Sequence, residues 1–416
     1  GVSLRRLFDE RRGRGTELDL SGVWRYRELV LPLGAEHAVS HPEGNTPLLR
    51  RGAIAEYAGL PGLQVKHEGH NPTGSFKDRG MTVAVTQAKR IAASAVACAS
   101  TGNTSAALAA YAAQAGLTAL VFVPAGQVAL GKLSQSLAYG ARTLLVRGDF
   151  DDCLRLVQEA SASLGVYLVN SINPFRLEGQ KTVMYRVLEA LRWQAPDWVV
   201  VPGGNLGNVS AFGKAFFELQ ELGLLTRVPR LAVINAAGAN TFSQLFDRFA
   251  VRWNEGAPDR NVIDGYYRAL EAEKIRAATI ASAIEINHPV NLPKALRALD
   301  FCGGAVRDVT DQEILDAKAK VGAGGLGCEP ASAASVAGTK KLVKEGIIAA
   351  GERVVCILTG HQLKDPTATV AYHSTDQKTF NEVLGHRGVR RATFANRAVQ
   401  VPNDLDEIIK AIELYS

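Results

Sequence analysis

Short apolar runs alternate with helical patterns between residues 95 and 170, and this alternation constrains the fold more than any other feature. Strand-like runs occur at residues 95–99, 117–123, 143–146 and 166–169, and helical patterns begin at Thr104, Leu130 and Asp149. Short apolar runs separated by helices are typical of βαβ units, whose parallel strands need helices on both faces. The segment therefore predicts an open, twisted, mainly parallel sheet.

A second alternation follows, with strand-like runs at residues 198–201, 230–235 and 354–358 and helical patterns beginning near Leu206, Asp311 and Ala331. Two α/β units are therefore expected, each built on an open twisted sheet. The length of 416 residues is also sufficient for two or three domains.

Composition excludes several classes of protein. Apolar residues make up 47% of the chain and charged residues 21%, and the net charge of +6 is mild for this length, so no nucleic-acid partner is expected. No apolar run reaches the ~18 residues needed to cross a membrane. The five cysteines are odd in number and lack CxxC spacing, which argues against a disulfide framework or a metal site and fits a reducing, cytoplasmic environment.

The run HEGHNPTGSFKDRG at residues 67–80 places one lysine, Lys77, between a turn and the start of a helix. The pairs Asn71–Pro72 and Thr73–Gly74 favour tight turns, and Ser75 is expected to cap the helix. In the first helical turn, the positive end of the dipole and any burial disfavour the ammonium form, and a neutral amine is the form that attacks a carbonyl group. Lys77 is therefore predicted to form a Schiff base.

Two loops stand at expected strand-to-helix junctions. Residues 202–208, PGGNLGN, can hold a phosphate group through backbone N–H groups and the helix dipole, and residues 100–104, STGNT, can hold a second anion. The run GAGGLG at residues 322–327 matches the dinucleotide-binding pattern but follows a helical pattern rather than a strand. A dinucleotide site, and with it a nucleotide-dependent oxidoreductase, is therefore rejected.

These motifs, in this order, resemble those of the pyridoxal-phosphate (PLP) enzymes of the tryptophan synthase β-like group, also called fold type II, and within them the threonine synthases most closely. The resemblance covers about residues 43–370. Its further carriers are PAG at residues 124–126, FDD at 150–152, LVNSINPFRLEGQKT at 168–182, CEPASAA at 328–334 and LTGHQLKDP at 358–366.

The resemblance implies two α/β domains with PLP in the cleft between them. The large domain would comprise residues 1–84 and 176–416, and the small inserted domain residues 85–175. Residues 372–416 would form a C-terminal tail to which no role is assigned, with a short helix at residues 405–414. A homodimer is implied as well.

The resemblance also implies roles for single residues. Lys77 would carry the cofactor, Asn103 would bond its 3′ oxygen, and Thr359 would meet its ring nitrogen, which a hydroxyl does not by itself hold protonated. The other cofactor-binding residues would be Phe76 and, around the phosphate, Gly204, Asn205, Leu206, Gly207 and Asn208. Substrate would be bound by Ser75, by Ser100, Thr101 and Thr104 at its α-carboxylate, and by Lys132, Asn170, Ser171 and Arg176 at a phosphate group.

The activity implied is conversion of O-phospho-L-homoserine and water to L-threonine and phosphate. Another PLP reaction stays open: threonine or serine dehydration, or β-replacement on O-phosphoserine as in cysteate synthase, would use the same lysine and phosphate loop. Arg176 disfavours an unphosphorylated substrate but does not separate phosphohomoserine from phosphoserine. A catalytically silent homologue is a further alternative, against which stands the presence of every expected catalytic residue.

Overall fold

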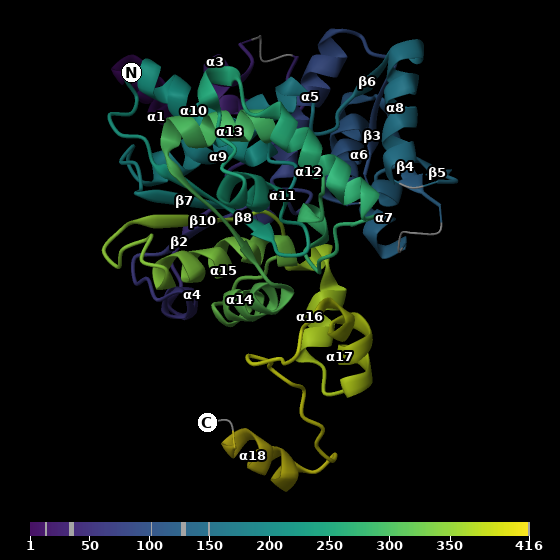
Figure 1. Ribbon diagram of the computed structural model, residues 1–416, viewed down its shortest axis with the longest axis vertical. Helices are drawn as coiled ribbons and strands as arrows, with labels where there is room; N and C mark the ends of the chain where they lie inside the picture. The colour runs from purple at the N-terminus through teal and green to yellow at the C-terminus, as the bar shows by residue number, and fades with distance from the viewer. Residues whose placement is uncertain (13–14, 33–36, 101, 126–129, 149, 415–416) are drawn as a thin grey trace.

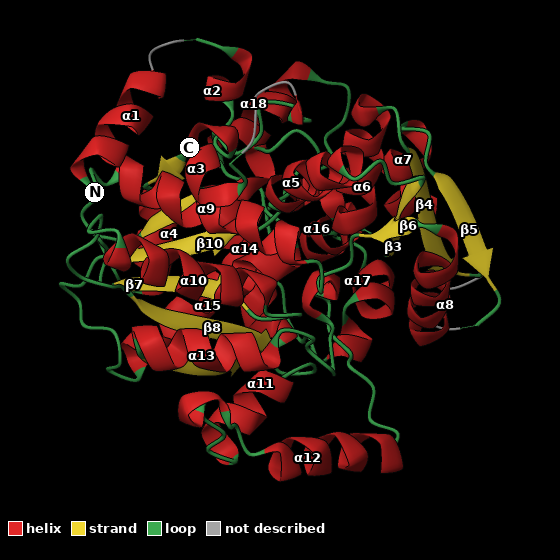
Figure 2. Ribbon diagram, turned by 90° about the horizontal axis from the view of Figure 1, so that it is seen from above, coloured by secondary structure: helices red, strands yellow, loops and turns green. Residues whose placement is uncertain are grey.

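The computed structural model describes residues 1–12, 15–32, 37–100, 102–125, 130–148 and 150–414, and its strands form two sheets (Figures 1 and 2). The larger sheet has the strand order β1-β2-β10-β7-β8-β9 and the smaller one the order β5-β4-β3-β6. Only β1 and β2 pair in antiparallel fashion; the other pairs between named strands of the described chain are parallel. The expected α/β class with mainly parallel sheets is confirmed.

The strands of the larger sheet are β1 (Leu48–Leu49), β2 (Gln64–His67), β7 (Trp198–Pro202), β8 (Arg230–Ala236), β9 (Gly304–Val309) and β10 (Val354–Leu358). Those of the smaller sheet are β3 (Ala95–Ala99), β4 (Thr118–Pro124), β5 (Arg142–Val146) and β6 (Val166–Leu168). Each strand-like run predicted from the sequence therefore corresponds to a strand, and the six predicted helices begin within one residue of their expected positions.

Helices cover both faces of the larger sheet (Figure 1). One face packs against α9 (Pro174–Ala190), α10 (Gly207–Glu221) and α13 (Leu292–Cys302), and the other against α4 (Gly52–Ala58), α14 (Asp311–Ala323) and α15 (Pro330–Lys344). Strand β7 is apolar on both sides because Val199 and Val201 belong to the first core and Trp198 and Val200 to the second. Continuous burial of this kind explains why its sequence has no polar alternation.

The smaller sheet is also covered on both faces. Helices α5 (Lys77–Arg90) and α6 (Asn103–Ala115) pack on one face and α8 (Phe150–Leu164) on the other, while α7 (Leu130–Ala138) connects β4 to β5. The boundaries expected for the two domains, at residues 84/85 and 175/176, stay a prediction.

Helices α5 and α9 cross at two glycines with their backbones in contact. A Cβ atom on Gly80 would lie 2.9 Å from the carbonyl oxygen of Arg176, and one on Gly179 would overlap the carbonyl group of Arg79. Lys77 and Arg176 each lie three residues, or about one turn, before the glycine of their own helix. The crossing therefore brings the first turns of the two helices together.

A buried ion pair ties the N-terminal segment to this region. Arg79 and Glu68 are fully buried and form a bidentate pair, with Nε to Oε2 at 2.6 Å and Nη2 to Oε1 at 2.8 Å. Arg79 also donates to the carbonyl oxygen of Gly44 at 2.7 Å. The bond to Gly44 holds the segment around residue 44 against α5. Removing Glu68 would leave the buried charge of Arg79 uncompensated.

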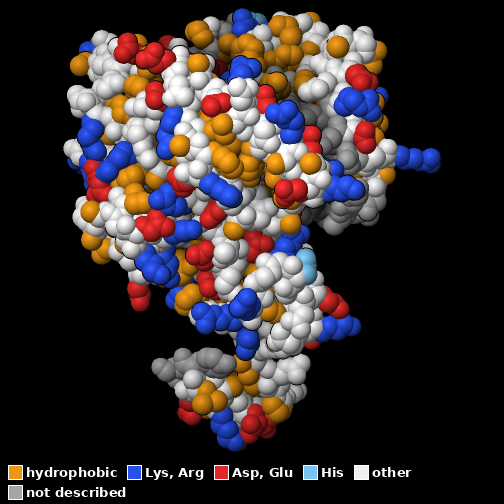
Figure 3. Space-filling view, viewed as in Figure 1, with side chains coloured by type: hydrophobic (Ala, Val, Ile, Leu, Met, Phe, Trp, Pro, Cys, Tyr) orange, Lys and Arg blue, Asp and Glu red, His pale blue; other side chains and the backbone are white. Residues whose placement is uncertain are grey.

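The remaining helices are α1 (Val2–Arg12), α2 (Glu17–Leu20), α3 (Arg27–Val30), α11 (Thr241–Ser243), α12 (Arg260–Ala272), α16 (Pro366–His373), α17 (Gln377–Val383) and α18 (Leu405–Glu413). Helices α16 and α17 pack on α14, whereas α18 stands apart from the body and buries none of its residues (Figures 1 and 3). The short terminal helix expected at residues 405–414 is thus confirmed. No helix in the described part of the chain is long and apolar enough to cross a membrane.

Candidate active site

The larger sheet brings its loops together at one edge. Because β2, β10, β7 and β8 run parallel, their carboxyl ends share an edge, where Thr359 follows β10 and Gly203 follows β7. Helix α10 then leads from β7 to β8 on one side, while β10 lies on the other side of β7. This is a topological switch point, the place where open α/β sheets bind their ligands.

The smaller sheet has its own switch point between β3 and β6, because β4 lies on one side of β3 and β6 on the other. Ser100 and Asn103 follow β3, and Asn170 and Ser171 follow β6. The sequence-predicted residues of both units are therefore found at the two positions where topology alone favours a binding site.

The loop before Lys77 is held by backbone pairing with the segment after β10. The N–H of Phe76 donates to the carbonyl oxygen of Thr359 at 2.9 Å, and the N–H of His361 donates to that of Gly74 at 2.8 Å. Helix α5 begins at Lys77, as expected. The expected cap is wrong in its position: Phe76 occupies the cap site without a side-chain bond, and Oγ of the buried Ser75 accepts from the N–H of Lys77 at 3.3 Å.

Burial lowers the pKa of Lys77 to about 7, and the positive charge of Arg176 contributes to the shift. Nζ of Lys77 lies 4.6 Å from the centre of the Phe76 ring. An amine whose pKa is near 7 is neutral for a large fraction of the time at neutral pH, which a lysine in water is not. The amine can thus act as a nucleophile and as a base.

Arg176 is buried with unsatisfied donors. Asn173 caps α9 by accepting from the N–H groups of Phe175 and Arg176, and Nη1 of Arg176 donates to the carbonyl oxygen of Val169 at 2.9 Å. Its Nε and Nη2 atoms have no hydrogen-bond partner among the described residues, although the side chain is only 1% exposed. Arg176 forms no surface ion pair with Glu178, whose carboxylate pairs with Lys181 and Lys214 instead. Two buried guanidinium donors near Lys77 match a bidentate anion such as phosphate.

The glycine loop after β7 leads into an uncapped helix. Leu206 adopts a left-handed conformation with φ of 61°, and α10 begins at Gly207 with no side chain bonded to its first turn. The first N–H groups of such a helix are available to an anion. Asn291, which is 1% exposed, fixes the loop by donating from Nδ2 to the carbonyl oxygens of Asn205 at 3.1 Å and Ser171 at 3.2 Å.

Asn103 and Thr359 both donate a hydrogen bond to the same carboxyl group, that of Glu329. Nδ2 of Asn103 donates to Oε2 of Glu329 at 2.8 Å, and Oγ1 of Thr359 donates to Oε1 at 3.0 Å. Burial raises the pKa of Glu329, and the hydrogen bonds from Asn103 and Thr359 act against this increase. The smaller and the larger sheet therefore meet at the two side chains expected to face the cofactor ring.

The other predicted residues are placed as follows. Thr104 is buried in the first turn of α6, and Ser100 is half-buried before it. The amide of Asn170 bonds both backbone groups of Ala99, with Nδ2 to the carbonyl oxygen at 3.0 Å and Oδ1 to the N–H at 3.1 Å, so one N–H remains for another partner. Asn208 is buried in α10. Thr101 and the side chain of Lys132 lie outside the described residues.

Two residues of the site are missed by the sequence motifs. Glu329 resembles an ordinary helix-initiating residue in CEPASAA, and Asn291 lies in a region without a recognisable pattern. CEPASAA is one of the motifs that support the resemblance, but no role follows from it for Glu329. The Glu-Pro pair adds only that proline at the first helical position marks the preceding residue as a helix boundary.

The lysine loop is flanked by three histidines, which are His67, His70 and His361. The rings of His67 and His70 are 4.5 Å apart, and burial together with His70 lowers the pKa of His67 to about 4. Nε2 of His67 contacts the carbonyl oxygen of Gly327 at 2.9 Å. Among the described residues no group of histidine, cysteine or carboxylate side chains has the arrangement of a metal site.

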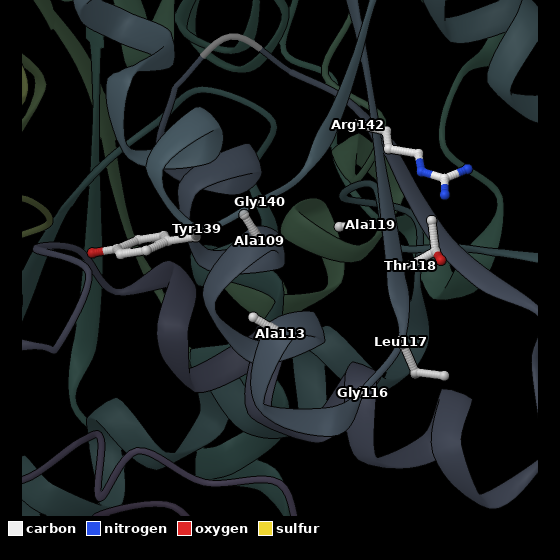
Figure 4. A pocket seen from close by; sticks show the side chains of 9 residues that line it. All are labelled: Ala109, Ala113, Gly116, Leu117, Thr118, Ala119, Tyr139, Gly140 and Arg142. Carbon is white, nitrogen blue, oxygen red and sulfur yellow. The ribbon is translucent and has the colours of Figure 1, made fainter.

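A pocket of about 280 Å³ lies elsewhere, between the end of α6 and the starts of β4 and β5 (Figure 4). Its lining includes Gly116, Thr118, Tyr139 and Arg142. Since the strands begin here, the pocket lies at the edge of the smaller sheet opposite to Ser100 and Asn103. It does not belong to the site around Lys77.

The residues present fit PLP. The cofactor needs a reactive amine, an anion site for its phosphate and polar groups around its ring. Lys77 offers the amine, the uncapped start of α10 offers the anion site, and the Asn103 and Thr359 side chains offer the polar groups. Arg176 adds unsatisfied donors for a second anion.

Comparisons with known proteins agree with this arrangement. Residues 39–360 match the family model described as pyridoxal-phosphate dependent enzyme. The chain is 47% identical over 350 residues to threonine synthase from Methanocaldococcus jannaschii, covering 84% of this chain and 82% of the relative. It is 48% identical over 349 residues to threonine synthase from Methanosarcina acetivorans, covering 84% and 81%.

Solved structures share the fold at low sequence identity. The processed form of threonine deaminase isoform 2 from Solanum lycopersicum superposes with a TM-score of 0.65 at 18% identity over 90% of each chain. Maize serine racemase superposes with a TM-score of 0.62 at 19% identity, covering 88% of this chain and 98% of the other. Both share the fold of this chain.

Proposed function

Because the chain belongs to the pyridoxal-phosphate-dependent enzymes, and within them to the threonine synthases, we propose that it converts O-phospho-L-homoserine and water to L-threonine and phosphate. The single observation that carries the choice of substrate is Arg176, whose Nε and Nη2 atoms are buried without partners near Lys77. An unphosphorylated amino acid would leave these donors unsatisfied, at a cost of about 1–3 kcal/mol each.

Lys77 has two tasks in this reaction. It holds the cofactor covalently, and once the substrate amino group has replaced it, the freed amine moves protons at Cα and Cβ of the substrate. PLP, when bound, supplies an electron sink that makes these protons acidic. The pKa of about 7 suits an amine that must both accept and return a proton near neutral pH.

Other residues bind and orient the substrate. The start of α6, with Ser100, Thr101 and Thr104, receives the α-carboxylate, which places Cα beside Lys77. Arg176, with Ser171, Asn170 and Lys132, holds the phosphate and stabilises it as it leaves from Cγ. Burial of Ser75 and Arg176 supports a site that excludes bulk water, so that the added water is a bound one.

The cofactor is proposed to lie between the two sheets, with its phosphate on residues 204–208, its 3′ oxygen at Asn103 and its ring nitrogen at Thr359. The division into residues 1–84 with 176–416 and the inserted residues 85–175 is proposed on the same grounds. We propose a homodimer, which family precedent supports, and a cytoplasmic location, which the cysteine usage supports.

The test is to incubate the PLP-loaded protein with O-phospho-L-homoserine and to quantify phosphate and threonine together. Equal amounts of the two products are expected. O-phospho-L-serine and L-threonine serve as parallel substrates, and turnover of either with no reaction of phosphohomoserine would replace the substrate assignment while leaving Lys77 in place.

A further inference from the structure

Glu329 is a buried carboxyl group at the junction of the two sheets. Its side chain is 4% exposed, and a Cβ on Gly360 would lie 2.6 Å from its carboxyl carbon, so the neighbouring backbone leaves no room for water on that side. It occupies the cap position of α15 without capping it. Both carboxyl oxygens are instead used by Asn103 and Thr359.

The position of Glu329 is set by the backbone. Its N–H donates to the carbonyl oxygen of Gly360 at 3.0 Å, and Cys328 pairs with His361 as in an antiparallel sheet. The segment that follows β10 is thus held between the lysine loop on one side and residues 328–329 on the other. Glu329 can therefore not move away from Thr359 without disturbing this pairing.

The hydrogen bonds of Glu329 are those of a carboxylate, because both of its oxygens accept. Asn103 and Thr359 donate to separate oxygens, and the positive charge of Lys364 adds to their effect. Burial acts in the opposite direction and raises the pKa of Glu329 above its ordinary value, and the neighbouring donors and the charge of Lys364 reduce this increase. Lys364 is itself fixed nearby, because its Nζ donates to Oε1 of Gln135.

A carboxylate determines the direction of the Thr359 hydrogen bond. A threonine hydroxyl has one proton and two acceptor lone pairs. When the proton is donated to Oε1 of Glu329, Oγ1 of Thr359 can only accept from other groups. One of these is Ser332, whose Oγ lies 2.9 Å from Oγ1 of Thr359 and 3.3 Å from the carbonyl oxygen of Gly360, and accepts from the N–H of Gly360 at 2.9 Å. One lone pair of Thr359 remains.

We propose that Glu329 is a positioning residue that makes Thr359 a hydrogen-bond acceptor toward the ring nitrogen of bound PLP, and so holds that nitrogen in its protonated form. The carboxylate of Glu329 would thus keep the ring nitrogen protonated through the hydroxyl of Thr359. In other PLP enzymes a carboxylate in direct contact with the nitrogen has this effect. The inference rests on the proposed function, in particular on Thr359 facing the ring nitrogen.

The experiment uses the holoenzyme reconstituted with PLP that carries ¹⁵N in its ring. The ¹⁵N chemical shift separates a protonated from an unprotonated ring nitrogen without any turnover. The wild-type enzyme is expected to give the protonated shift at pH 7. In Glu329→Gln, the amide can donate to Thr359, which then donates to the ring nitrogen, and the unprotonated shift is expected.

Three further variants separate this role from a structural one. Thr359→Val should give the unprotonated shift, and adding Glu329→Gln to it should change nothing more, because the two residues act in one chain of hydrogen bonds. Ser332→Ala is the matched control: it removes a neighbour of Thr359 but leaves Glu329, so the protonated shift should remain. In kinetics, Glu329→Gln should lower kcat more than it changes KM.

An unprotonated ring nitrogen in the wild-type enzyme would overturn the inference, and this result does not depend on any variant folding. A protonated nitrogen in Glu329→Gln would overturn it as well. Either result is distinct from failure of the proposed function, which would be seen as absent threonine formation by the wild-type holoenzyme.

Discussion

Nδ2 of Asn103 donates a hydrogen bond to Oε2 of Glu329 at 2.8 Å, although 226 residues separate the two in the sequence. Asn103 begins the first helix after β3, and Glu329 precedes α15, which packs on the larger sheet. One hydrogen bond therefore joins the two sheets at the site itself, so that the relative position of the sheets and the position of the polar side chains are coupled.

Replacing Lys77 with Ala should abolish both threonine formation and covalent attachment of PLP, because no other amine is placed at the start of α5. Borohydride reduction followed by mass spectrometry measures the attachment. Lys89→Ala, at the exposed end of the same helix, should behave as the wild type. Threonine formation by the Lys77→Ala protein would contradict the assignment.

The rate at which PLP attaches to the cofactor-free protein should depend on pH through Lys77. Because burial lowers the pKa of Lys77 to about 7, the amine is charged below that pH and neutral above it. The rate should therefore rise about tenfold per pH unit below pH 7 and level off above it. A free lysine derivative, whose rate rises up to about pH 10.5, is the control; the same profile for the protein would rule out a buried amine.

Changing Arg176 to Leu should specifically weaken the binding and turnover of phosphorylated substrates. Loss of charge-assisted hydrogen bonds, at about 1.5–3 kcal/mol each, predicts a decrease in kcat/KM of at least tenfold for O-phospho-L-homoserine. Binding of L-threonine, followed by the change in cofactor absorbance, should change little. Arg268→Leu, an exposed arginine on α12, is the matched control. If the variant lost as much affinity for L-threonine as for O-phospho-L-homoserine, a role of Arg176 in phosphate binding would be excluded.

Gly179→Ala should destabilise the protein, since the new Cβ would overlap the carbonyl group of Arg79 and force α5 and α9 apart. Overpacking of this kind costs about 1–3 kcal/mol. Gly265→Ala is the control, because it lies inside α12 with open space around it and should stabilise that helix by about 0.5–1 kcal/mol. Thermal unfolding of the two variants should thus shift in opposite directions.

The sequence predicts most of the interior strands, because burial on both faces leaves unbroken apolar runs such as residues 95–99 and 354–358. It does not predict β1, the interior strand β2, or β9, an edge strand in which Arg307 interrupts the pattern. In the fold Arg307 forms ion pairs with Asp247 and Glu345 at 2.8 Å. A charge that is satisfied by partners distant in the chain cannot be distinguished from a loop residue by local pattern.

The residues of the candidate site also fall into a group that the sequence predicts and a group that it does not. Loops that carry their chemistry in consecutive residues, such as the lysine loop and residues 204–208, can be predicted. Glu329 and Asn291 cannot, because their importance lies in long-range contacts with Asn103, Thr359 and Ser171. The Ser75 cap is predicted at the wrong position because pairing with the segment after β10 sets the start of the helix, and local propensity does not include that pairing.

The placement of the site at the carboxyl ends of the strands has a practical consequence for protein engineering. Turns that enter β4, β5 and β8, around Gly116, Gly140 and Gly223, lie at the opposite edge of the sheets. The three glycines have φ between 66° and 80° and should be kept, so additions belong beside them in these turns. Affinity tags, fluorophore attachment points or short inserted peptides placed at these turns would be carried far from Lys77. The enzyme could therefore be labelled or immobilised there with its catalytic edge left accessible.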